Sequence, residues 1–263
     1  MSSNRMAAWT LAALAATGAA AAQDAREIRR DLPLAAGGRV SIDTYKGSVS
    51  VTGWDQPRVE IVARIEPSND EPDQPEKVRL TDVRIEDSGA AVRITTDYGR
   101  LKEKRRSLFG WDDTGVLPRV HYIVRMPRRA AFQLKDHKSQ IDVRGLDGEI
   151  DLDSYKGVVD IEGTSGLRLK TYKGEVRARF DRLERESAFE TYKGEITVEL
   201  PARAAFDLDV DAGDRGDIDN DFTVGVRVAD RGKDGTRLNG PVNGGGPALR
   251  LETHKGSFRI RRR

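Results

Sequence analysis

The feature that most constrains this chain is a four-residue motif that recurs along it. The copies are Thr44-Tyr45-Lys46-Gly47, Ser154-Tyr155-Lys156-Gly157, Thr171-Tyr172-Lys173-Gly174, Thr191-Tyr192-Lys193-Gly194, Thr253-His254-Lys255-Gly256 and the degenerate Asp136-His137-Lys138-Ser139. In the middle of the chain the fourth positions are 139, 157, 174 and 194. Self-similarity at a nearly fixed period is typical of repeat architectures, in which each repeat packs on its neighbours.

Apolar and polar residues alternate on both sides of each motif. Ile150 and Leu152 precede the motif at Ser154, and Val159 and Ile161 follow it. Alternation with a period of two indicates strands that bury one face. The inward position before each corner and the next inward position after it are an odd number of residues apart, so the chain must bend there. Glycine permits the positive φ that such a bend often needs. The five predicted corner glycines are Gly47, Gly157, Gly174, Gly194 and Gly256.

No single repeat can bury its apolar face alone, so the repeats must stack. Apolar residues make up 37% and aromatic residues 6% of the chain, which suits a thin core. Stacking at about 4.8 Å would pair each strand with its equivalents above and below. We therefore predict an all-β fold, a single-stranded parallel β-helix or solenoid with rungs of about 17–22 residues. A right-handed winding is expected. A hairpin meander is the alternative, and equivalent corners at a regular spacing favour stacking.

The N-terminus predicts export. Residues 1–22 have a basic Arg5, an apolar stretch and the small residues Ala20, Ala21 and Ala22, as in a secretory signal peptide. A weak N-terminal anchor is the alternative. We expect a lead-in segment at 23–37 and a solenoid domain at 38–263, in the periplasm or at the cell surface. Loops are expected near 67–76, 100–118 and 229–247, strands over 77–98, and an irregular rung over 211–221. The chain has no cysteine, so disulfides and thiolate metal sites are excluded.

Several segments together resemble one known family. They are the Thr-x-x-Gly-x-Ile/Val rung, Val51-Thr52-Gly53-Trp54-Asp55, Ile123-Val124-Arg125-Met126-Pro127 and the closing segment 249–258. In this order they resemble the bacterial "putative adhesin" β-solenoid family, also called DUF4097, over roughly residues 38–260. The resemblance implies a β-solenoid at or near the envelope and brings no catalytic residues with it. The uniform Tyr-Lys corners depart from what it explains.

Stacked corners would create two parallel rows of side chains. We call them the aromatic row, with Tyr45, His137, Tyr155, Tyr172, Tyr192 and His254, and the lysine row, with Lys46, Lys138, Lys156, Lys173, Lys193 and Lys255. One hypothesis is a binding stripe, in which tyrosine faces stack on sugar rings and lysines meet carboxylates or phosphates. Its ligand would be an acidic glycan, another envelope polyanion or an envelope protein. The alternative is structural, because stacked rings and lysine stems would shield the corner. Self-association through the end rungs is a further hypothesis.

Other functions have weaker support. Asp207, Asp209 and Asp211 alternate as on the solvent face of a strand, and the wider Asp cluster to Asp221 matches no calcium-loop spacing. Arg215-Gly216-Asp217 spells an integrin-type tripeptide at a position where a turn is expected. Residues 102–111 combine basic and aromatic side chains and suit either a tucked loop or a membrane contact.

The sequence also lacks the signatures of catalysis and of nucleic-acid binding. It has no nucleophile elbow, P-loop or zinc-protease motif. Polysaccharide cleavage by a pair of groove carboxylates is the enzymatic alternative. The 45 basic and 43 acidic residues are interleaved, which is unlike a nucleic-acid footprint. We predict a binding or scaffolding protein that is not an enzyme, with no cofactor or metal.

Overall fold

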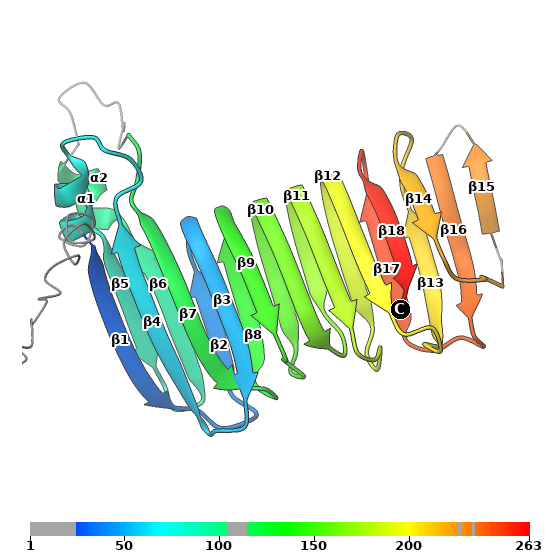
Figure 1. Cartoon of the computed structure of the whole chain (residues 1–263), viewed down its shortest axis with the longest axis horizontal. Helices are drawn as coiled ribbons and strands as arrows, with labels where there is room; N and C mark the ends of the chain where they lie inside the picture. The colour runs from blue at the N-terminus through cyan, green and yellow to red at the C-terminus, as the bar shows by residue number, and fades with distance from the viewer. Residues whose placement is uncertain (1–24, 105–114, 226–227, 233–234) are drawn as a thin grey trace, which may run out of the picture.

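The computed structural model describes residues 25–104, 115–225, 228–232 and 235–263 (Figure 1). The expected signal peptide and part of the basic and aromatic stretch lie outside these residues. The described residues form one sheet of 18 strands and two short helices, α1 (Gln74–Leu80) and α2 (Gly99–Lys104). The all-β prediction is confirmed. No helix in the described ranges combines the length and the apolar character that a membrane span requires.

Each repeat folds as a strand, a corner and a second strand, which together we call a rung. The first arm leads to the corner and the second arm leaves it. Three rungs, β10 (Ile150–Thr164), β11 (Arg168–Phe180) and β12 (Ser187–Leu200), run through the corner as one strand. The other first arms are β2 (Arg39–Asp43), β6 (Ala91–Asp97), β8 (Ala131–Asp136), β13 (Phe206–Asp211) and β17 (Ala248–Thr253). Their second arms are β3 (Lys46–Trp54), β7 (Arg119–Pro127), β9 (Lys138–Arg144), β14 (Asp217–Asn220) and β18 (Ser257–Arg262).

Neighbouring rungs pair in parallel, but their order in space does not follow the chain throughout. From β8 to β12 each rung lies on the one before it, as predicted. The rung β2/β3 lies between β6/β7 and β8/β9. The last rung in sequence, β17/β18, lies between β12 and β13/β14, so the red C-terminal strands are inside the stack in Figure 1.

Antiparallel strands extend the sheet at both ends of the stack, so the sheet is mixed rather than purely parallel. At one end β1 (Arg26–Pro33) pairs with β4 (Arg58–Glu66), β4 pairs with β7, and β5 (Asp82–Asp87) pairs with β6. At the other end β16 (Gly235–Val242) pairs with β13 and with β15 (Val228–Gly232). The described chain therefore does not form a purely parallel β-helix. The handedness of the winding stays a prediction.

Three segments differ from the sequence expectations. The expected loop at 229–247 contains the antiparallel pair β15 and β16, in which Gly232 lies opposite Gly235. The strands expected over 77–98 begin later, because residues up to Leu80 belong to α1, which has Pro75 in its first turn and buries Val78. The lead-in segment at 23–37 contains β1, which is part of the sheet.

The core lies between the two arms and follows the predicted alternation. Phe132 and Leu134 of a first arm and Ile141 and Val143 of the following second arm are all buried. Equivalent residues of the other rungs join them in one continuous apolar cluster. The Thr, Ser or Asp that precedes each member of the aromatic row is also buried, because it takes an inward position in the alternation of the first arm. The outward side chains of both arms and the corner itself are left for function.

Candidate binding edge at the corners

Equivalent corners lie over one another along one edge of the stack. Lys156 pairs with Lys173, and Lys173 with Lys193, in the parallel ladder. In the same way Gly174 lies between Gly157 and Gly194. Further copies extend this edge in both directions, because Lys46 pairs with Lys138 and the backbone N–H of Lys255 donates to the carbonyl of Tyr192. The sequence prediction that the corners align is confirmed.

Glycine is required at these corners for a reason that the sequence did not reveal. Positive φ occurs at Gly47 (140°) and Gly194 (150°), but Gly157 and Gly174 do not have it. A Cβ added at Gly174 would lie 2.3 Å from the carbonyl oxygen of Gly157, and one at Gly194 would lie 2.0 Å from that of Gly174. At Gly174 and Gly194 the corners are thus packed backbone against backbone, which leaves no space for a side chain, whereas the degenerate corner has Ser139 at this position.

The aromatic row is a continuous stack of rings. Centroid distances between successive rings from Tyr45 to Tyr192 are 4.5, 4.8, 4.9 and 4.9 Å, with interplanar angles of 6° or less. His254 stacks on Tyr192 at 5.1 Å with a tilt of 21°. At the other end Tyr98 and Tyr45 form a T-shaped pair, with centroids 6.3 Å apart and an interplanar angle of 79°.

This stacking changes the expected binding mode. The faces of Tyr155 and Tyr172 are occupied by neighbouring rings, so these faces cannot receive sugar rings. Solvent reaches the ring edges and hydroxyl groups instead, and these tyrosines are 47% and 45% exposed. Inside the row the rings therefore support the corner, as the structural alternative proposed, and present phenol hydroxyls outward.

The lysine row lies beside the rings, and no ion pair joins its lysines to a carboxylate of the described residues. In the described part of the chain, lysine ion pairs are formed by Lys77 and Lys170, which belong to other surfaces. Lys255 lies over the Tyr192 ring, with Nζ 5.5 Å from the centroid. Lys46 donates to Ser68 Oγ at 3.1 Å, and burial, with Arg119 and Lys138 nearby, lowers its pKa. The other lysines of the row are exposed.

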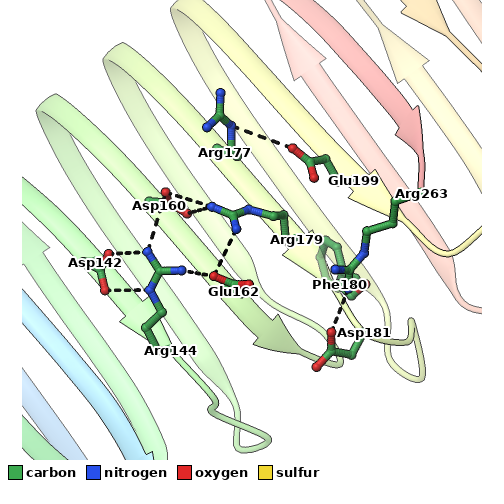
Figure 2. A network of polar contacts seen from close by, with 10 residues as sticks. All are labelled: Asp142, Arg144, Asp160, Glu162, Arg177, Arg179, Phe180, Asp181, Glu199 and Arg263. Carbon is green, nitrogen blue, oxygen red and sulfur yellow. Dashed lines mark hydrogen bonds and ion pairs between the residues drawn. The ribbon is translucent and has the colours of Figure 1, made fainter.

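Charged side chains on the outer face of the second arms, in contrast to the lysine row, form ion pairs with one another (Figure 2). Arg144 contacts Asp142 at 2.7 Å and also pairs with Glu162, and Arg179 pairs with Asp160 at 3.1 Å. The Arg144–Asp142 pair lies within β9, whereas the pairs with Glu162 and Asp160 cross from rung to rung, as parallel in-register strands allow. Farther along, Arg177 lies 3.8 Å from Glu199. The fold thus balances charge across rungs on this face, whereas it leaves the lysine row unbalanced.

A groove of about 550 Å³ runs beside the aromatic row, on the side of the first arms. Its lining includes Tyr155, Tyr172, Tyr192 and His254 on one side. The last residues of the first arms line the other side and carry both signs of charge, and they are Lys135, Asp153, Lys170, Glu190, Glu252 and Asp211. The groove is therefore bounded by ring edges and by mixed charges, which suits a polar ligand.

The degenerate corner contains a buried carboxylate. Asp136 Oδ2 accepts hydrogen bonds from the backbone N–H of Ser139 at 2.9 Å and from Ser154 Oγ at 3.0 Å. Thr253 Oγ1 accepts from the N–H of Gly256 in the same way. The first residue of the motif thus caps the corner in at least these two rungs.

The other sequence candidates form no site. The described residues contain no cluster of three or more metal-ligating side chains. Asp219 and Asp221 pair with Arg261, and Asp211 pairs with Arg237. The Arg215-Gly216-Asp217 tripeptide leads into β14, and a Cβ at Gly216 would lie 2.0 Å from the Ala212 carbonyl oxygen.

Sequence reasoning missed one polar cluster, which combines Ser48, His121 and Glu66. Ser48 Oγ lies 2.8 Å from His121 Nδ1, and His121 Nε2 lies 3.7 Å from Glu66 Oε2. Burial lowers the pKa of His121, while Glu66 raises it to a smaller extent. Ser48 lies within β3, which pairs on both sides, so its surroundings offer no turn whose free N–H groups could stabilise an oxyanion. We interpret the cluster as a cross-strand hydrogen bond.

The fold and the corner edge define a class of all-β repeat scaffold with a continuous surface row of aromatic and basic residues. Searches with the sequence found no matching family model and no matching curated protein. Among solved structures, a "putative cell adhesion protein" from Clostridium sporogenes is similar, with 13% identity and a TM-score of 0.53. The match covers 91% of this chain and 100% of that one. It shows that the two proteins share a fold.

Two further solved structures, each described as a "putative adhesin", match less well in space. The one from Bacteroides fragilis is 11% identical with a TM-score of 0.21, and covers 90% of this chain and 97% of its own. The one from Parabacteroides merdae is 7% identical with a TM-score of 0.19, and covers 89% of this chain and 96% of its own.

Proposed function

We propose that this chain is an exported binding module of the bacterial envelope, not an enzyme, and that its corner edge binds an extended polyanion such as an acidic glycan. In this proposal the parallel rungs act as a right-handed β-helical scaffold of the DUF4097 type. The adhesion role in the description of the Clostridium sporogenes protein agrees with a binding function. The observation that carries the proposal is the unpaired lysine row.

An unpaired row of this kind has an energetic cost. Neighbouring rungs are about 4.8 Å apart. Two ammonium groups about 5 Å apart repel by about 0.8 kcal/mol even in bulk water. The same rungs place carboxylates next to arginines on the second arms, where Arg144 and Arg179 are each paired. An anionic chain that lies across the rungs would relieve the repulsion at each lysine in turn, because its charges would meet one ammonium group per rung.

The stacked rings complement this role. They hold the backbone of each corner in register and set the lysines on a rigid edge. A rigid, preorganised row loses less conformational entropy on binding than mobile side chains on a loop. The phenol hydroxyls of Tyr155 and Tyr172 add donors and acceptors along the same edge.

Replacing Lys156, Lys173 and Lys193 with Gln tests the proposal. Each exposed ion pair contributes about 0.2–1 kcal/mol, so binding of oligogalacturonate or inorganic polyphosphate should weaken by roughly threefold to a hundredfold. The salt dependence of binding should become shallower, because fewer counterions are displaced. The matched control replaces Arg129, Arg168 and Arg203, which are exposed and lie at the end of the rungs away from the corners. Equal binding by both triple variants would refute the proposal.

End-to-end self-association is the second candidate, and the strands at the ends oppose it. The outermost described second-arm strand at one end is β14, which has four residues and includes Asp217 and Asp219. At the other end β1 carries five charged residues on an eight-residue strand and ends at Pro33. Short and charged edges resist pairing with another copy. A constant mass by light scattering over a wide concentration range would exclude self-association.

A further inference from the structure

The two ends of the aromatic row differ. At the end near β6, the Tyr98 ring packs on Tyr45 in a T-shaped arrangement. At the other end the row finishes at His254, and the next rung beyond it is β13/β14. In that rung Asp211 pairs with Glu252, so Gly213 occupies the position that a ring holds in the rungs of the aromatic row.

Gly213 leaves the outer side of His254 without a ring. It has a φ of 60°, and a Cβ at this position would lie 2.8 Å from the Thr253 carbonyl oxygen. The Gly213 backbone therefore packs on the backbone of the corner and carries no side chain there. In the part of the chain that the structure describes, no second aromatic ring stacks on His254 besides Tyr192. One face of His254 is thus free of ring stacking among the described residues, whereas interior rings such as Tyr172 stack on both faces.

This face lies at one end of the groove beside the aromatic row. The lining there includes Glu252, Asp211 and Arg237. Arg237 Nε donates to Asp211 Oδ2 at 2.9 Å, and the two residues come from the paired strands β16 and β13. Glu252 is exposed and is adjacent to His254 in sequence. Carboxylate acceptors and a guanidinium donor therefore surround one side of an aromatic face.

We propose that this end of the groove is a subsite for the terminal sugar ring of an acidic glycan. The proposal deepens the polyanion-binding function and rests on it. The C–H face of a pyranose would pack on the imidazole of His254, and its hydroxyl groups would bond to Glu252 and Arg237. The remaining sugars would extend across the rungs, with their carboxylates beside the lysine row.

The composition of the groove favours a sugar over a bare anion at this position. Asp153, Glu190 and Glu252 line it together with Asp211, against the cations Lys135, Lys170 and Arg237. These charges nearly balance and give no excess of cations that would attract a chain of phosphates, whereas the carboxylates can accept hydrogen bonds from sugar hydroxyls. The lysine row and the groove therefore recognise different parts of one ligand, its charge and its ring.

Two probes separate these contributions. Oligogalacturonate carries both rings and carboxylates, whereas inorganic polyphosphate carries charge without rings. Replacing His254 with Ala should weaken oligogalacturonate binding by roughly twofold to tenfold and leave polyphosphate binding unchanged. His254→Tyr restores an aromatic face and should bind oligogalacturonate as well as the natural chain does. His121→Ala is the matched control, because His121 lies on β7, outside the aromatic row and the groove.

The outcomes separate the two proposals. If the natural chain binds both probes through the lysine row and His254→Ala has no effect, the subsite is refuted and polyanion binding stands. Binding of polyphosphate alone also refutes the subsite alone. Binding of neither probe overturns both proposals. An equal loss for both probes in His254→Ala would show that the ring acts through the fold, which refutes the subsite as well.

Discussion

Replacing Gly174 with Ala tests whether close backbone packing, rather than backbone conformation, requires glycine at the corners. Gly174 does not have a positive φ, so alanine can adopt its conformation. Its new Cβ would lie 2.3 Å from the Gly157 carbonyl oxygen and 3.3 Å from the carbonyl carbon and the amide nitrogen of Gly157. The closest approach is about 1 Å short of an ordinary contact.

This overlap cannot be relieved by a side-chain rotation, because the obstructing atoms belong to the backbone of the neighbouring rung. Moving that rung away would lengthen the ladder hydrogen bonds and the ring contact between Tyr155 and Tyr172, now 4.9 Å. Overpacking in a close-packed region typically costs about 1–3 kcal/mol, and we expect Gly174→Ala to lie at or above the upper end of that range. The loss should appear as a lower urea midpoint in unfolding followed by circular dichroism.

Gly37→Ala is the matched control. Gly37 lies in a turn with no atom within 4 Å of an added Cβ, so its replacement should change stability by less than about 0.5 kcal/mol. Gly194→Ala should destabilise at least as much as Gly174→Ala, since Gly194 combines an approach of 2.0 Å with a φ of 150°. If Gly174→Ala is neutral and Gly194→Ala is not, backbone conformation is the cause and the close-packing explanation is wrong.

Three further predictions follow from the rings and the buried titratable groups. Tyr172→Ala removes two stacking contacts and should lower the free energy of unfolding by about 1–3 kcal/mol. Tyr172→His places at this position the residue found at His137 and His254, and should lower it less. Equal losses of stability in urea unfolding would contradict this prediction. Burial lowers the pKa of His121 in the folded chain, so the unfolded chain takes up the proton first as the pH falls below about 6.5. The free energy of unfolding should therefore decrease there. His121→Gln should reduce that decrease between pH 8 and pH 5.5, and an unchanged decrease would contradict the lowered pKa of His121. Burial raises the pKa of Tyr98 and Tyr122, so both phenols should stay protonated in the folded chain at a pH where exposed tyrosines ionise. Absorbance titration of Tyr98→Phe and Tyr122→Phe variants would identify their contributions. Ionisation of either phenol together with the exposed tyrosines would refute its burial.

Local patterns in the sequence were sufficient for the rung and for the alignment of corners. Alternation identified the buried residues of both arms, such as Leu152 and Val159, because a strand exposes one face and buries the other whatever its partner is. The repeated Tyr-Lys-Gly step identified the two rows, because in-register stacking places identical positions side by side. The Ser48–His121 contact gave no such signal, since its residues are 73 positions apart and the other rungs do not repeat a Ser–His pair at these positions.

The sequence by itself therefore determined the strands, the corners and the two rows of this protein. Only the tertiary structure decided the order of the rungs at the ends, where β17/β18 inserts beside β12, because that order depends on which exposed edge each late strand finds. It also decided that ring faces inside the aromatic row are covered, while at its end no ring of the described residues besides Tyr192 stacks on His254. The physical reason is that stacking depends on what the neighbouring rung places opposite each ring, and at Gly213 the neighbour has no side chain.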